Sequence, residues 1–136
     1  MNRKRIWYLR KPGRLCWLQH DYILLLPPPE LRSEPGEEDA WVSLANQCLQ
    51  IRAGFAWDGA WPLPRWRCLL RASLVHDALY HLMRKDGMPW HLRRYADAQL
   101  RKIAIEDGAP AWLAAACYYA VRLFGRWRRT QVLHHD

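Results

Sequence analysis

The amino-acid sequence predicts an α+β fold, in which a small N-terminal antiparallel sheet is followed by a three-helix C-terminal half. Short apolar or alternating runs, broken by Pro and Gly, fill the first part of the chain, and beyond residue 65 apolar residues recur at helical spacing. The chain has 136 residues, the size of one domain. We therefore expect a single domain over 1–136, with mainly strands and loops over 1–60, three helices over 65–126 and a basic tail over 127–136.

The expected strands lie on both sides of a proline-rich acidic segment, residues 27–39, which we expect to be an exposed loop. Turn residues such as Pro12-Gly13 separate the apolar runs before it, and a further run follows it. The strands are predicted at Ile6–Leu9, Cys16–Gln19, Asp21–Leu26 and Gln47–Phe55.

Three helices are predicted at Arg67–Arg84, Trp90–Asp107 and Ala111–Phe124. The first carries one apolar stripe and is therefore expected to be amphipathic, with the stripe formed by Leu70, Leu74, Ala78 and Leu82. Gly87 and Gly108 are expected to end the first two helices. The third is apolar nearly all round and is expected to lie in the middle of the fold, followed by a frayed basic end.

The charge balance points to an anionic partner. Lys and Arg number 21 against 13 Asp and Glu, which gives a net charge of +8, and nine residues are Trp. This composition suits phosphate groups or a lipid headgroup surface, at which Trp57, Trp61 and Trp66 are expected to lie. Nucleic-acid binding is not expected, because the basic residues are scattered and no helix-turn-helix or RNP-like motif is present.

The four cysteines are far apart and form no C-x-x-C pair, which argues against a zinc ribbon and provides no disulfide framework. The basic N-terminal segment lacks the apolar core of a signal peptide, and no run approaches the ~20 apolar residues of a membrane span. We therefore expect synthesis in the cytoplasm, and the sequence does not specify where the protein acts.

The candidate catalytic residues lie on the first two helices. His76 and Tyr80 are four residues apart and share a helix face, whereas Asp77 is rotated from His76 by about 100°. Asp97 lies on the second helix, which a short connection makes an antiparallel neighbour of the first. A carboxylate on one helix can then meet an imidazole on the other and fix its tautomer and orientation.

A calcium site is predicted just before the first helix. Asp58 lies between Trp57 and Gly59, in a loop where Gly54 and Gly59 allow backbone carbonyls to point inward. Asp58 and Asp77, together with the carbonyls of Trp57 and Gly59, would form an all-oxygen site. Such a site suits Ca²⁺ better than Mg²⁺, because Ca²⁺ accepts irregular, carbonyl-rich coordination.

Each of these residues also has a purely structural interpretation. Asp77 could pair with Arg71, Arg84 or Arg94, and a helical Asp such as Asp97 commonly pairs with an Arg four residues away. For Asp97 those partners would be Arg93 or Arg101. The cluster would then be a polar network that holds helices together.

The strings GFAWDGAWPLP, LVHDALY, YADAQLRKIAIEDGAP and YYAVRLFG resemble a family of small, functionally uncharacterised proteins that is common in bacteriophages and prophages. The resemblance spans Ile51 to Gly125 and follows the order and spacing of the family's motifs. Trp61 departs from the pattern, because the family usually has Ser there. Membership implies a phage or prophage origin but no activity.

A second resemblance, carried by the HD-x-x-Y helix, the Asp of the next helix and the upstream Gly-containing loop, is to the active site of phospholipase A2. It implies that His76 is the general base on water, that Asp97 holds His76 and that Tyr80 supports both. It also implies that Asp77 binds Ca²⁺ with carbonyls of residues 54–60. Secreted phospholipases A2 have cysteines beside this motif, where this chain has Ala72, Ser73 and Leu79.

The expected function is therefore a phage-encoded, calcium-dependent hydrolase that acts on a lipid ester, with phospholipid or an anionic membrane surface as its partner. The alternative is a non-enzymatic phage structural or accessory protein, which would bind other phage proteins and use the cluster as a structural network. A phosphohydrolase of the HD type ranks lower, since that class needs a further upstream His and only His20 is present.

Overall fold

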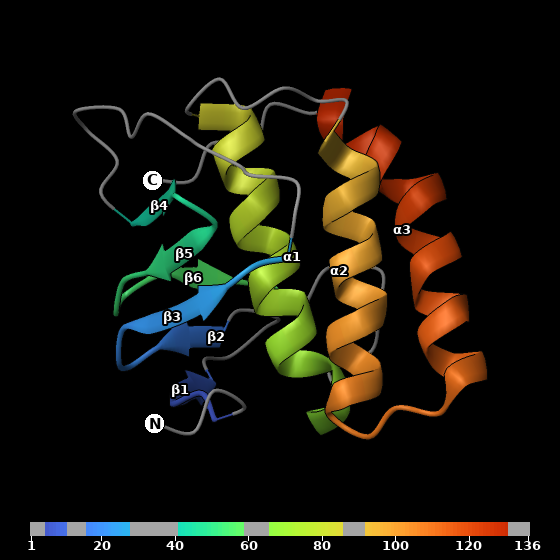
Figure 1. Ribbon diagram of the computed structural model, residues 1–136, viewed down its shortest axis with the longest axis horizontal. Helices are drawn as coiled ribbons and strands as arrows, with labels where there is room; N and C mark the ends of the chain where they lie inside the picture. Colours follow the sequence, from blue (N-terminus) through green and yellow to red (C-terminus); the bar gives the residue numbers. More distant parts are fainter. Residues whose placement is uncertain (1–4, 11–15, 28–40, 59–65, 86–91, 131–136) are drawn as a thin grey trace.

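The structure is a computed structural model that describes residues 5–10, 16–27, 41–58, 66–85 and 92–130, with side chains for all of these except 85 and 125–130 (Figure 1). The loop predicted at 27–39 lies almost wholly outside the described residues. Gly59, Trp61 and Gly87 also lie outside them.

The N-terminal half forms two three-stranded antiparallel sheets, which confirms the α+β class, although a single sheet was expected. One sheet has the order β1-β2-β6 and the other β3-β5-β4. Alternate residues point inward, so Cys16 and Leu18 are buried while Trp17 between them is exposed. The strands are β1 (Tyr8–Arg10), β2 (Cys16–Leu18), β3 (Tyr22–Leu25), β4 (Val42–Ala45), β5 (Cys48–Ile51) and β6 (Ala56–Trp57).

Strand β4 was not predicted, because the predicted strand began only at Gln47. β4 and β5 form a hairpin in which Ala45 pairs with Cys48, so Asn46 and Gln47 alone make the turn. Their φ angles are +51° and +68°, the pattern of a type I′ turn, which matches the twist of the flanking strands. The buried, alternating Val42 and Leu44 were the available sequence signal.

Three helices follow, as predicted: α1 (Arg67–Lys85), α2 (Arg93–Glu106) and α3 (Ala111–Thr130). In Figure 1 the sheets, α1, α2 and α3 lie side by side in that order, and each helix runs antiparallel to the next. Gly108 follows the end of α2 with φ +98°, the left-handed conformation that glycine adopts at helix ends.

The positions of the first and third helices differ from those expected. Every residue of α1 from Leu69 to Met83 is buried, because the sheets cover one side of this helix and α2 the other. α3 is the outermost helix and packs against α2, so it does not lie in the middle of the fold. It also continues to Thr130 instead of fraying after Phe124.

Among the described residues, no helix combines the length and the apolar character needed to cross a bilayer.

Candidate functional site

The buried carboxylate of Asp97 on α2 receives two hydrogen bonds from α1. His76 donates from Nε2 to Asp97 Oδ1 at 2.7 Å, and the Tyr80 hydroxyl donates to the same oxygen at 2.7 Å. The i, i+4 spacing on α1 places both donors on the face toward α2. The structure therefore brings together three of the residues singled out from the sequence.

A third helix reaches the same carboxylate through an arginine that sequence reasoning did not assign. Arg122 on α3 donates from Nη1 to Asp97 Oδ2 at 2.9 Å, and Arg93 Nη1 lies 3.7 Å from that oxygen. Arg93 also donates to the carbonyl oxygens of Val121 and Arg122. The only signal for Arg122 was its place in YYAVRLFG. We call His76, Tyr80, Asp97 and Arg122 the Asp97 network.

The Asp97 network lies inside the protein. His76 is 1% exposed and Asp97 is 0% exposed, and the neighbouring Asp77 is 4% exposed. Electrostatic interactions are stronger in such an interior than in water. The charged and hydrogen-bonding side chains around Asp97 therefore shift one another's pKa values.

The pKa values of the network follow from this burial and from its charges. Burial alone would raise the pKa of Asp97, but His76, Tyr80 and Arg122 outweigh it and lower that pKa. Burial would likewise lower the pKa of His76, but the carboxylates of Asp77 and Asp97 raise it above its ordinary value. Burial, followed by the charge of Asp97, raises the pKa of Tyr80, which therefore stays a hydrogen-bond donor.

The second ring nitrogen of His76 has a different environment. Nδ1 is buried and has no hydrogen-bond partner within the part of the chain that the structure describes. The nearest carboxylate oxygen, Asp77 Oδ1, is 3.7 Å from it, which is longer than a hydrogen bond. Asp97 thus fixes the imidazole through Nε2, and Nδ1 is left without a hydrogen bond from a described residue.

The residues of the predicted calcium site are only partly brought together. Asp58 follows β6 and is half-buried, and both Asp58 and Asp77 already interact with other residues. Across the described segments, no three His, Cys, Asp or Glu side chains are placed to hold a metal ion. Since Gly59 lies outside those segments, the described donors do not by themselves form the site, and calcium binding stays a prediction.

The glycine and tryptophan expected to serve this loop have structural roles. Gly54 turns the chain with φ +99°, and a Cβ there would lie 2.7 Å from the Trp41 ring. Trp57 is 2% exposed and donates from its indole to Ser73 Oγ at 3.1 Å, so its expected position at a lipid interface is wrong. Trp66 is exposed, as that expectation requires.

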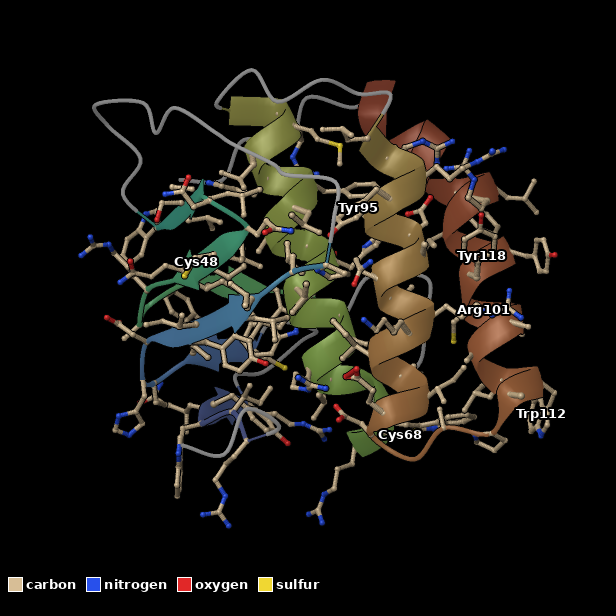
Figure 2. The ribbon with its side chains drawn as sticks, viewed as in Figure 1. Cys48, Cys68, Tyr95, Arg101, Trp112 and Tyr118 are labelled. Atoms are coloured by element: carbon tan, nitrogen blue, oxygen red, sulfur yellow. The ribbon has the colours of Figure 1, made fainter. Side chains whose placement is uncertain are left out.

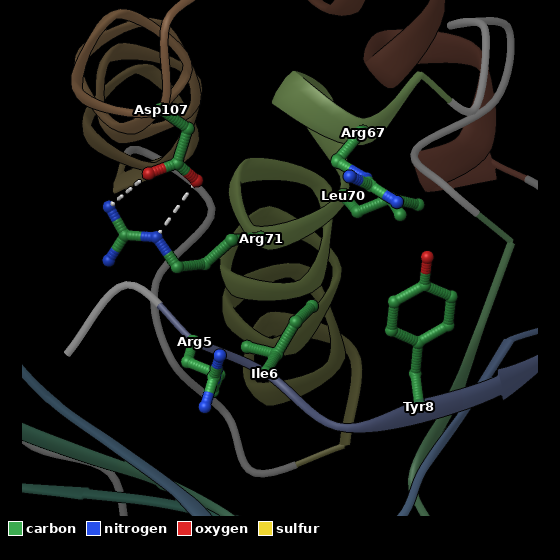
Figure 3. A pocket seen from close by; sticks show the side chains of 7 residues that line it. All are labelled: Arg5, Ile6, Tyr8, Arg67, Leu70, Arg71 and Asp107. Atoms are coloured by element: carbon green, nitrogen blue, oxygen red, sulfur yellow. Dashed lines mark hydrogen bonds and ion pairs between the residues drawn. The ribbon is translucent and has the colours of Figure 1, made fainter. Parts of the chain in front are cut away.

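Arg71 on α1 binds elsewhere and is not a partner of Asp77 in the hydrogen bonds described here. Its buried guanidinium donates to both carboxylate oxygens of Asp107, to Glu106 and to the Tyr22 hydroxyl. Beside it lies a hollow of about 390 Å³, shown in Figure 3. The hollow is lined by Arg5, Ile6, Tyr8, Arg67, Leu70, Arg71 and Asp107, none of which belongs to the Asp97 network.

Comparison of the chain with protein families, with curated proteins and with solved structures gives no match.

Proposed function

We propose that this chain is a hydrolase of lipid esters, with His76 as the general base on water and Asp97 as the residue that orients it. The observation that carries the proposal is the 2.7 Å hydrogen bond from His76 Nε2 to Asp97, which leaves Nδ1 without a hydrogen-bond partner among the described residues. A histidine held by a carboxylate through one nitrogen, with the other available to a proton, is the arrangement of a catalytic dyad.

In this reaction, neutral His76 takes a proton from water at Nδ1 while the water oxygen attacks the ester carbonyl carbon. The tetrahedral intermediate then breaks its bond to the alcohol oxygen, and Nδ1 returns the proton to that leaving group. Asp97 stays ionised throughout, because Tyr80 and Arg122 bind its carboxylate. It stabilises the imidazolium that forms between the two proton transfers.

Burial of His76 weighs against this chemistry and favours the structural alternative, because a general base must be within reach of water and substrate. Since His76 is 1% exposed, an ester reaches Nδ1 only when side chains around α1 move aside. The hollow beside Arg71 offers no such route, because no residue of the Asp97 network lines it.

The predicted calcium site uses residues other than His76 and Asp97. Asp58 and Asp77, with the carbonyls of Trp57 and Gly59, would hold Ca²⁺, which when bound would stabilise the oxyanion of the intermediate. The net charge of +8 supports an anionic phospholipid surface as the substrate in this proposal. The phage or prophage origin remains part of the same proposal.

The test measures fatty-acid release from phospholipid vesicles in the presence of Ca²⁺. We expect the wild-type protein to release fatty acid and His76→Gln to release it about 10²–10⁴-fold more slowly, because general-base catalysis contributes a factor of this size. His81→Gln is the matched control, because His81 is also buried on α1 but contacts Phe55 instead of Asp97. Equal losses in both variants would contradict the role of His76.

A second candidate is a non-enzymatic phage structural or accessory protein in which the network only holds helices together. It is favoured by the complete burial of Asp97 and by the fact that α1 and α3 both bind its carboxylate. In that case the wild-type protein releases no fatty acid, and His76→Gln lowers the melting temperature as its main effect, since a buried partner of Asp97 is lost.

A further inference from the structure

Helix α3 has two apolar faces, and the described part of the chain covers only one of them. The inner face packs against α2 and consists of Leu113, Ala114, Cys117 and Val121, all of them buried. A second set, which we call the outer stripe, consists of Trp112, Ala116, Tyr119 and Leu123. These four lie within about 60° of one another around the helix axis, at 100° per residue.

The large side chains of the outer stripe are strongly exposed. Trp112 is 70% exposed, Tyr119 is 61% exposed and Leu123 is 73% exposed. In Figure 2, Trp112 projects from α3 on the side away from α2. Surface helices normally carry polar residues at such positions, so a contiguous apolar stripe indicates a surface that another body covers.

The charges around the outer stripe are of one sign. α3 contains no Asp or Glu, and its Arg122 is bound to Asp97. The adjacent helix α2 exposes Arg94, Arg101 and Lys102, and the Arg101 guanidinium lies 5.8 Å from the centre of the Tyr118 ring (Figure 2). On the same helix Asp97 is buried and bound to Arg122, and Glu106 pairs with Arg71, so within the described residues Arg94, Arg101 and Lys102 have no acidic partner on α2 or α3.

We propose that the outer stripe docks α3 onto the surface of an anionic lipid bilayer. Trp112, Tyr119 and Leu123 would enter the interfacial region, with the exposed Arg94, Arg101 and Lys102 of α2 at the level of the headgroup phosphates. An apolar face bordered by Arg and Lys, with aromatic residues among its apolar side chains, is the chemistry of a helix that lies in the membrane interface. The proposal does not depend on hydrolysis, because none of these three residues belongs to the Asp97 network.

A second copy of this chain fits the outer stripe less well. The stripe is about 17 Å long at 1.5 Å per residue, and one such helix pair buries much less than the ~1,200 Å² of a stable interface. In a parallel pair, the arginine-rich halves of two α3 helices would also meet without an acidic partner on either. In an antiparallel pair, those halves would meet the positive helix N-termini.

The test is co-sedimentation of the full chain with vesicles of phosphatidylcholine, with and without phosphatidylglycerol. We expect binding only when phosphatidylglycerol is present, and weaker binding as salt is added. Leu123→Glu and Trp112→Ser should each weaken the binding at least about tenfold, because each removes a large apolar side chain from the interface. Leu25→Ser is the matched control, since Leu25 is 60% exposed on β3.

Circular dichroism spectra show whether the variants are folded, and Trp112→Ser provides the test if Leu123→Glu is not. Equal binding to both kinds of vesicle, unchanged binding of the folded variants, or a loss in Leu25→Ser as large as theirs would overturn the proposal. Self-association without vesicles that Leu123→Glu abolishes would also overturn it and assign the outer stripe to a second copy.

Discussion

Asp97 is the residue on which the buried network depends. One of its oxygens binds His76 and Tyr80, and the other binds Arg122, so three helices meet at one carboxylate. A buried charge of this kind is stable only while its partners are in place, because an unpaired charge in the interior is costly. The same contacts hold Asp97 ionised and fix the imidazole of His76.

At the residue scale, the protonation of His76 predicts a pH dependence of stability in metal-free buffer. Its pKa is raised in the folded protein, because the carboxylates of Asp77 and Asp97 outweigh burial. The resulting stabilisation is fully present below the unfolded value of about 6.5 and is lost as the pH rises through the folded pKa. The free energy of unfolding in urea, measured from below about pH 6.5 upward, should decrease with pH in the wild type and not in His76→Gln. The same pH dependence in both proteins would contradict the role of His76.

Calcium binding is also tested at single residues. Millimolar Ca²⁺ should raise the melting temperature of the wild type, because a ligand that binds only the folded state stabilises it. Asp77→Asn should abolish the rise, since it removes a charged ligand while keeping the shape of the side chain. Asp21→Asn should keep the rise, because Asp21 accepts a hydrogen bond from the Ala53 N–H and is not part of the predicted site. No rise in the wild type would exclude the metal.

At the element scale, the hairpin of β4 and β5 contains local strain. Gln47 adopts φ +68°, a conformation that costs a non-glycine residue roughly 1–2 kcal/mol. Gln47→Gly should therefore stabilise the protein by about 0.5–1 kcal/mol, after the entropic cost of glycine is subtracted. The free energy of unfolding in urea measures the change. Gln47→Val should destabilise, and a gain in both variants would mean that backbone strain is not the cause.

The elements show which parts of the fold could be predicted from local patterns. The α+β class and the three helices follow from hydrophobic periodicity, and the meeting of His76 with Asp97 follows from the spacing on two antiparallel helices. Hydrophobic periodicity could not predict the burial of α1 on all sides or the edge position of α3, because both depend on which elements cover each helix. Arg122 reaches Asp97 only after α3 has packed on α2, and no local pattern carries that contact.

At the scale of the whole molecule, Arg71 joins the two halves of the fold. It is 3% exposed and connects Tyr22 of β3 with Glu106 and Asp107 at the end of α2. Arg71→Lys keeps the charge but loses the planar fork that binds Asp107 through two nitrogens. We expect it to lower the free energy of unfolding by about 1–3 kcal/mol, as measured in urea. Arg101→Lys, at an exposed position, is the control and should change little.

We propose that Asp97 orients a base and does not only hold three helices together. The most direct test is the rate of fatty-acid release by Asp97→Asn, measured at a temperature where circular dichroism shows the variant to be folded. We expect a 10²–10⁴-fold lower rate than that of the wild type, because an amide holds the wrong tautomer of His76 and cannot stabilise the imidazolium. A folded variant with an unchanged rate, or a wild-type protein that releases no fatty acid, would contradict it.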